Sequence, residues 1–257
     1  MESPKAREFE FTLPIGYEDA DGRVHRVAVL RKMTGREEAL IADKTNRGNG
    51  ARLITELLSS CIVRLGALDR PGRQTAQALY SADRHFLLMK LREITFGPEM
   101  AASYACPTCR EANATTENLA DLDVRRLPDG EVVRDIVVEL EDGYVDRDNQ
   151  IYTSMVFRYP TGVDEEKVAP TLRENAAAGK NALLARCLKA VGDMPERRRE
   201  ALGTTLFSEL TLSDRALIDK ALNAGGPGIE MKRTLSCGGC GRQFGASLDM
   251  SNFLSPS

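Results

Sequence analysis

Aromatic and histidine residues are scarce in this sequence, and their scarcity narrows the functions it can perform. The 257 residues include no tryptophan, two histidines and only 5% aromatic residues. The two isolated histidines, His25 and His85, are few candidates for a general base or for the ligands of a catalytic metal ion. Neither a His-Glu-x-x-His motif nor a phosphate-binding P-loop occurs. We therefore expect a protein that is not an enzyme and that has no small-molecule substrate.

Long apolar runs and a strong net charge are missing too. No segment approaches about 18 consecutive apolar residues, and residues 1–10 are charged without an apolar stretch, so we expect neither a membrane span nor an export signal. The formal net charge of −3 gives no broad attraction to nucleic acid. The chain is long enough for one large or two modest domains, and 42% of its residues are hydrophobic and can build their cores. These features predict a globular protein that is cytoplasmic at synthesis.

What the chain does contain is a pair of CxxC motifs, far apart in the sequence. They are Cys106-Pro107-Thr108-Cys109 and Cys237-Gly238-Gly239-Cys240. A tetrahedral structural zinc ion takes four sulfur or nitrogen ligands, usually from two short knuckles. Neither histidine flanks a pair, and two separate sites would each lack two ligands. The sequence therefore predicts one structural Zn²⁺ shared by four metal ligands, namely Cys106, Cys109, Cys237 and Cys240.

The residues around each CxxC motif favour a zinc ribbon. β-compatible residues such as Ser103-Tyr104-Ala105 and Thr234-Leu235 lead into the motifs, and comparable residues lead out of them. This pattern predicts two hairpins that each carry a CxxC at the tip. The two halves of the ribbon are then split by a long insertion.

Two other chemistries stay open as alternatives. A CxxC at a helix N-terminus can perform thiol–disulfide exchange, but Cys109 is followed by polar residues and a Thr pair rather than by a helix pattern. A nucleic-acid-binding zinc ribbon is the second alternative. The knuckles carry only Arg110 and Arg242, without a basic cluster or an aromatic platform, so we expect no nucleic-acid partner.

The other two cysteines have the sequence context of core residues. Cys61 lies on an apolar stripe with Leu57 and Leu58, and Cys187 lies on a second stripe with Leu184. A free cysteine on such a stripe behaves as a small hydrophobic residue. Both are therefore predicted to be structural.

The order of local patterns predicts an α+β fold. A β-hairpin over residues 9–30 turns at Asp21-Gly22, and a capping box at residues 34–37 begins a helix that runs to about residue 46. Helices over 51–65 and 75–93 form a helical hairpin before the first knuckle.

A β-hairpin also begins the insertion. Its arms are residues 132–140 and 151–159, with a turn at Asp142-Gly143, and a small helical bundle over 164–174, 180–191, 195–206 and 213–223 follows. We therefore expect three parts, 1–122, 123–229 and 230–257. The first holds the hairpin, the helices and the first knuckle, the second is the insertion, and the third holds the second knuckle and the tail.

Several segments in this order resemble the T4-type tail baseplate hub and assembly proteins of contractile phages, which also occur in phage-derived contractile injection systems. The resemblance spans nearly the whole chain. The segments that carry it are Phe9–Leu13 with Asp21-Gly22, Leu30–Glu38, Leu57–Gly66, Phe96-Gly97 before the first CxxC, Arg158–Asp164, and Phe244 with Ser251–Leu254 after the second CxxC.

The resemblance implies a structural or assembly role, with other baseplate or tail hub proteins as partners and a place in a phage tail or injection-system particle. It implies no catalytic residues. We expect partners to bind the helical hairpin at 51–93 or the insertion. The tail segment Met250–Pro256 carries the neighbouring apolar side chains of Phe253 and Leu254, which we expect to dock on the body of the protein itself.

Overall fold

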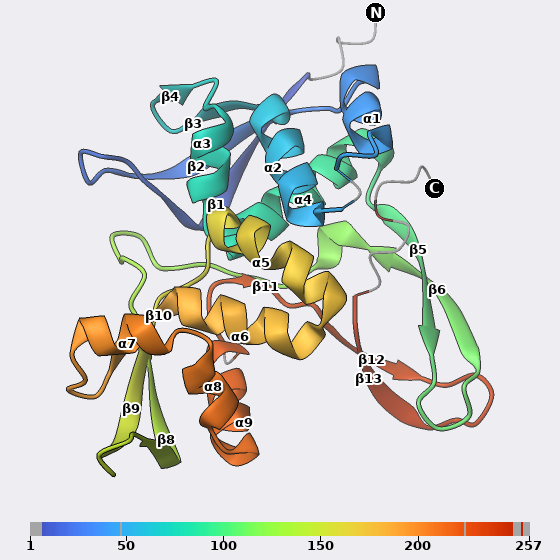
Figure 1. Ribbon diagram of the computed structural model, residues 1–257. Coiled ribbons are helices and arrows are strands. Elements are labelled where there is room, and N and C mark those ends of the chain that lie inside the picture. Colours follow the sequence, from blue (N-terminus) through green and yellow to red (C-terminus); the bar gives the residue numbers. More distant parts are fainter. Residues whose placement is uncertain (1–6, 47, 224, 249–252, 254–257) are drawn as a thin grey trace, which may run out of the picture.

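The computed structural model describes residues 7–46, 48–223, 225–248 and 253, and it has the predicted α+β fold (Figure 1). The predicted N-terminal hairpin is present. The elements of the first half, in chain order, are β1 (Glu8–Glu18), β2 (Val24–Arg31), α1 (Gly35–Ala42), α2 (Gly50–Cys61), β3 (Ile62–Leu65), β4 (Leu68–Asp69), α3 (Arg73–Ala78), α4 (Ser81–Phe96), β5 (Glu99–Ala105), β6 (Ala112–Asn118), the 3-10 helix η1 (Leu119–Asp121) and β7 (Val124–Arg125).

The second half begins with the inserted hairpin and ends with the second knuckle. Its elements, in chain order, are β8 (Ile136–Val145), β9 (Ile151–Phe157), α5 (Gly162–Glu174), α6 (Ala176–Cys187), β10 (Leu188–Val191), α7 (Glu196–Leu202), α8 (Thr205–Glu209), α9 (Leu212–Asn223), β11 (Gly228–Ile229), β12 (Lys232–Ser236) and β13 (Gln243–Ser247).

Two of the predicted helices end earlier than expected, each at a cysteine. The chain leaves α2 after Cys61 and becomes β3, which pairs with β2, and it leaves α6 after Cys187 and becomes β10, which pairs with β9. The predictions of helix to residues 65 and 191 were wrong because the apolar residues of each strand continue the helical spacing. Pairing with a neighbouring strand decides the conformation there.

The other differences are breaks inside predicted elements. The helix expected at 75–93 is divided between α3 and α4 by an extended Leu79-Tyr80, and the helix expected at 195–206 is divided between α7 and α8. The first helix ends at Ala42 rather than near residue 46. Asp142-Gly143 lies in a bulge of β8 rather than in the hairpin turn, which falls after Val145.

Two large apolar cores lie within the described part of the chain. The first is formed by side chains of β1, β2, β3, α2, α3, α4, β5 and η1, and the second by side chains of β8, β9, β10, α6, α8 and α9. The predicted docking of the tail falls mostly on residues outside those described. Phe253 is described, and its side chain is buried in the first core, as is that of Leu248. No described helix is both long enough and apolar enough to cross a membrane.

The second half repeats the hairpin of the first. In both halves an antiparallel pair contains a bulge, at Thr12–Tyr17 in β1 and at Glu139–Tyr144 in β8. Both turns are held by an aspartate, Asp19 or Asp146, which accepts backbone N–H groups from the residues two and four positions later. We call residues 8–96 the first repeat and residues 136–223 the second repeat.

The helices after each hairpin are also anchored in the same way. Arg31 forms a two-point ion pair with Glu37, and Arg158 forms one with Asp164. Each arginine also donates to the backbone carbonyl oxygen of the residue before the cysteine that ends α2 or α6. Each acidic residue occupies the third position of a helix that begins after a threonine.

A third shared contact joins the last helix of each repeat to its first strand. Asp83, near the start of α4, accepts N–H groups of Ile15 and Gly16, and Asp214, near the start of α9, accepts that of Gly143. The same hydrogen bonds at the same points of two chain segments indicate an internal duplication. Within the described part of the chain, the second repeat has no counterpart of β4 and gains α7.

Candidate metal centre

Each repeat is followed by one of the two predicted CxxC hairpins. β5 pairs with β6 through Ala105 and Ala112, and β12 pairs with β13 through Ser236 and Gln243, so each CxxC lies in the loop at the tip. The two loops have the same backbone geometry. In both, the N–H of the first cysteine donates to the carbonyl oxygen five residues later, at 2.9 Å. A left-handed residue, Arg110 or Gly241, follows the second cysteine of each motif.

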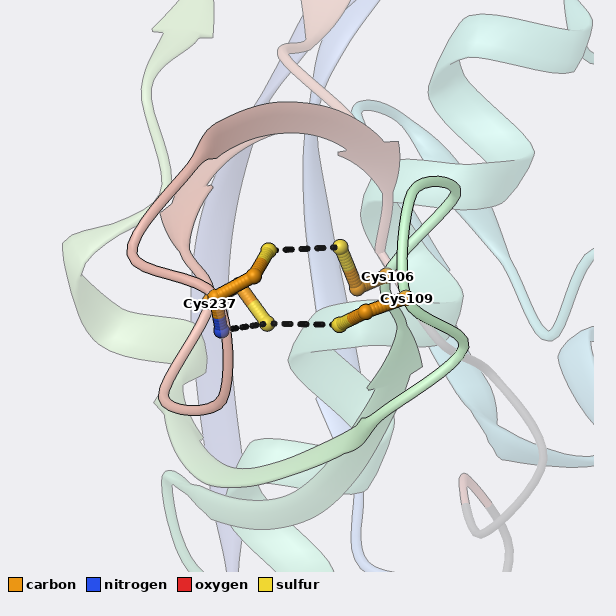
Figure 2. A group of neighbouring side chains, drawn as sticks. Cys106, Cys109 and Cys237 are labelled. Carbon is orange, nitrogen blue, oxygen red and sulfur yellow. Dashed lines mark hydrogen bonds between the residues drawn. The ribbon is translucent and has the colours of Figure 1, made fainter.

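The hairpins bring the four predicted ligands together. The four Sγ atoms lie within 4.8 Å of one another, and they come from both loops (Figure 2). Cys106 Sγ is 3.8 Å from Cys240 Sγ, and Cys109 Sγ is 3.5 Å from Cys237 Sγ. Four thiolates around a zinc ion at about 2.3 Å would be roughly 3.8 Å apart. These separations are far longer than a disulfide bond of about 2.05 Å, so the arrangement fits a tetrahedral metal ion.

The clustered cysteine thiols shift one another's pKa values because their sulfur atoms lie so close together. The backbone N–H of Cys240 is the main cause that lowers the pKa of Cys237 to about 6. Cys109 also receives a backbone N–H, from Glu111, but the neighbouring sulfur atoms, Cys237 first, outweigh it and raise its pKa to about 12. The cluster therefore does not hold four thiolates at neutral pH by itself. A bound divalent cation would favour the ionised form of all four.

One residue that the sequence did not single out joins the two knuckles. Asn113 is the second residue of β6, the exit strand of the first knuckle, and its Oδ1 accepts the N–H of Gly238 in the second knuckle at 2.8 Å. Its Nδ2 donates to the carbonyl oxygens of Tyr104 and Glu111 and lies 3.9 Å from Cys237 Sγ. No local motif marks this asparagine, because its role depends on a hairpin far away in the sequence.

Below the knuckles, side chains from both hairpins share a small core and a polar link. The buried members of this core are Ala102, Tyr104, Cys106, Cys237 and Phe244. Glu117 of β6 accepts hydrogen bonds from the hydroxyl of Tyr104 at 2.7 Å and from Nε of Arg233 on β12 at 3.0 Å. The hairpins thus pack as one unit, which holds the four sulfur atoms in place.

The two remaining cysteines lie away from this cluster, in the cores where the sequence places them. Cys61 belongs to the first core and Cys187 to the second. Burial raises the pKa of each thiol to about 12. Both therefore stay protonated and unreactive at neutral pH.

The CxxC context differs from that of a thiol oxidoreductase. Both motifs occupy hairpin tips, whereas the redox motif opens a helix whose N-terminus stabilises the thiolate. The knuckle surface carries Arg110 and Arg242 as its basic residues, which is a sparse charge for a nucleic-acid interface.

The chain was compared with known protein families, curated proteins and solved structures. The family model described as "T4 bacteriophage base plate protein" matches residues 6–254, which is nearly the full chain. Comparisons with curated proteins and with solved structures give no match.

Proposed function

The chain belongs to the T4 bacteriophage base plate protein family, and we propose that it is a non-enzymatic structural or assembly protein of a phage-type tail baseplate or contractile injection system. The observation that carries this proposal is the family match across both repeats and both CxxC hairpins. A molecule built from two repeats and a clustered set of cysteines would act by presenting surfaces to its partners. Its partners would be other baseplate or tail hub proteins.

Within this role, the proposed function of Cys106, Cys109, Cys237 and Cys240 is to hold one structural Zn²⁺. The proposal is supported by the all-sulfur donor set, the separations between the Sγ atoms, and the shared core beneath the knuckles. The ion would join a hairpin that follows the first repeat to a hairpin that follows the second. It would thereby fix how the two halves of the chain are arranged, since structural zinc contributes about 10–16 kcal/mol of apparent folding free energy in small peptides.

The protein would be made in the cytoplasm and then act on, or remain in, a tail or injection-system particle. The division into 1–122, 123–229 and 230–257 stays a prediction. So does partner binding through the helical region at 51–93 or through the insertion, and surface variants in both regions that leave complex formation unchanged would contradict it.

The proposed role is tested by tagging the protein in cells that assemble the particle, and identifying what co-purifies by mass spectrometry. We expect baseplate or hub proteins to be enriched over an untagged control. Deletion of the gene should give particles that lack an assembled baseplate. Normal particles after deletion, together with no tail protein in the pull-down, would contradict the proposal. Retained metal with binding to DNA or RNA that weakens steeply with salt would instead favour the nucleic-acid alternative.

A further inference from the structure

The two repeats contact each other through different surfaces. The segment before α5 in the second repeat lies against the junction of α3 and α4 in the first repeat. The N–H of Ser81 donates to the carbonyl oxygen of Pro160 at 2.9 Å, and the N–H of Gly162 donates to that of Leu79 at 3.1 Å. The first repeat thus offers its α3–α4 junction, and the second offers the start of α5. Such a contact is heterologous, because each side uses a different patch.

Arg84 lies at the centre of this contact, and its surroundings show which residues the contact requires. Arg84 is fully buried, and its Nη1 donates to the carbonyl oxygen of Ala76 at 2.7 Å. Its Nε donates to the carboxylate of Glu165 in the second repeat at 3.0 Å. Gly162 makes room for the guanidinium, since a Cβ there would lie 2.5 Å from its Cζ atom. The contact therefore needs an arginine on one side, and a glycine and a glutamate on the other.

The second repeat keeps the arginine side of this contact, with Arg215 half-buried and Leu212 exposed. Arg215 follows Asp214 as Arg84 follows Asp83, and its Nη1 donates to the carbonyl oxygen of Phe207 at 2.6 Å. That carbonyl is the only partner of the guanidinium among the described residues. Leu212, the counterpart of the buried Ser81, has 84% of its surface exposed.

The first repeat keeps the glycine and glutamate side, and Gly35 and Glu38 are exposed in the described part of the chain. Thr34-Gly35 and Glu38 correspond to Thr161-Gly162 and Glu165, with the same spacing before α1 as before α5. A Cβ on Gly35 would meet no atom within 4 Å. The carboxylate of the exposed Glu38 has no hydrogen-bond or ion-pair partner in the part of the chain that the structure describes. Gly35 therefore leaves room at the start of α1 for a group from another molecule, as Gly162 leaves room for Arg84.

We propose that the protein associates with further copies of itself, head to tail, by repeating its internal contact between chains. The α8–α9 junction of one copy would bind the start of α1 in the next copy. Arg215 would lie over Gly35 and pair with Glu38, and Leu212 would be covered beside Met33. Both halves of the contact are present on one chain, which is why a second copy fits it. α1 lies at the top of the molecule in Figure 1 and α8 and α9 lie at the bottom, so the two surfaces are far enough apart for each to bind a different copy.

A heterologous contact of this kind either closes into a ring or continues as an open chain. Mass photometry and sedimentation velocity of the purified full-length protein, over a concentration series from nanomolar to millimolar, measure which form exists. We expect species larger than the 28.2 kDa monomer. Glu38→Arg and Leu212→Arg should each weaken association at least about tenfold, because each places an arginine against Arg215 or in the space beside Met33. Val137→Arg and Glu8→Arg are matched controls at exposed positions outside the contact, and they should associate as the wild type does.

Mixing the two disabled variants tests the head-to-tail geometry itself. A Glu38→Arg chain keeps an intact α8–α9 junction, and a Leu212→Arg chain keeps an intact α1 surface. Their mixture should give a 1:1 dimer and no larger species, although each alone stays monomeric. Unchanged circular dichroism of both variants excludes misfolding. A wild type that is monomeric throughout the series, or variants that associate as the wild type does, would overturn the proposal. Either result would leave the proposed baseplate role intact, because that role rests on the family match and on co-purification.

Discussion

The buried carboxylate of Glu37 provides a sharp test of how the first repeat is stabilised. Burial alone would raise the pKa of Glu37, but the two-point hydrogen bond from Arg31, the hydroxyl of Ser60 and the N–H of Thr34 lower it to about 2. The unfolded chain should have a pKa near the ordinary value of 4.5. At about 1.4 kcal/mol per pKa unit, the difference corresponds to roughly 3 kcal/mol of stability at neutral pH.

The sign of the pH dependence follows from the lowered pKa. A carboxyl group whose pKa is lower in the folded state stabilises the fold fully above pH 4.5, and this contribution is lost as the pH falls towards 2. Glu37→Gln removes the charge but keeps the size of the side chain. We therefore expect it to lower the free energy of unfolding by about 3 kcal/mol at pH 7, and by progressively less as the pH falls from 4.5 to 2.

Urea unfolding of the wild type and of Glu37→Gln, followed by circular dichroism at a series of pH values, measures this difference. Both proteins carry the same cysteines, so acid release of a metal affects them equally. Glu8→Gln is the control, since Glu8 is exposed on β1 and its substitution should change stability little. A difference in unfolding free energy below about 0.5 kcal/mol at pH 7, or one that does not shrink with acid, would show that the Glu37 carboxylate does not stabilise the first repeat in this way.

Three further outcomes follow from the structure. Asn113→Ala should weaken metal binding roughly tenfold or more, because it removes the hydrogen bond that fixes the second knuckle. Competition with a chromophoric chelator measures the affinity. An unchanged affinity would show that Asn113 does not position the site. Gly162→Ala should clearly lower the melting temperature, because the added Cβ overlaps Arg84. Gly35→Ala should leave the melting temperature of the dilute monomer nearly unchanged, because no atom lies near that position. Equal effects of the two substitutions would contradict the close contact between Gly162 and Arg84. Cys187→Ser should destabilise the second core while leaving the metal content per chain unchanged, as elemental analysis and thermal unfolding would show.

The candidate site could be located from the sequence because its cysteines occur in two short motifs. Four cysteines in two CxxC pairs predict a shared ligand set from residue type and spacing alone. Cys106, Cys109, Cys237 and Cys240 do lie together, and their binding of a metal stays a prediction. The hairpins and the capping box at Thr34 were also correct, since turn residues and caps act over a few positions. Local chemistry of this kind needs no tertiary information.

The parts that the sequence did not reveal depend on contacts between distant segments. Pairing with β2 or β9 converts Ile62–Leu65 and Leu188–Val191 from an apparent helix into a strand. Asn113 acquires its role only when the two hairpins meet. The duplication left a weak signal, Gly-Tyr-x-Asp at residues 16–19 and again at 143–146, with Leu-Leu-x-x-Cys before each strand β3 and β10. Few side chains are identical between the repeats, so the shared hydrogen bonds identify the duplication more clearly than the residues do.

We propose that one metal ion joins the two CxxC hairpins, and the metal content per chain measures this. The measurement is elemental analysis of protein purified without added zinc, alongside the variant with Cys106→Ser and Cys237→Ser. We predict one zinc per wild-type chain and none in the variant, together with a loss of stability in the variant. Metal-free wild-type protein that is fully folded and whose thiols react rapidly with an alkylating reagent would contradict the account.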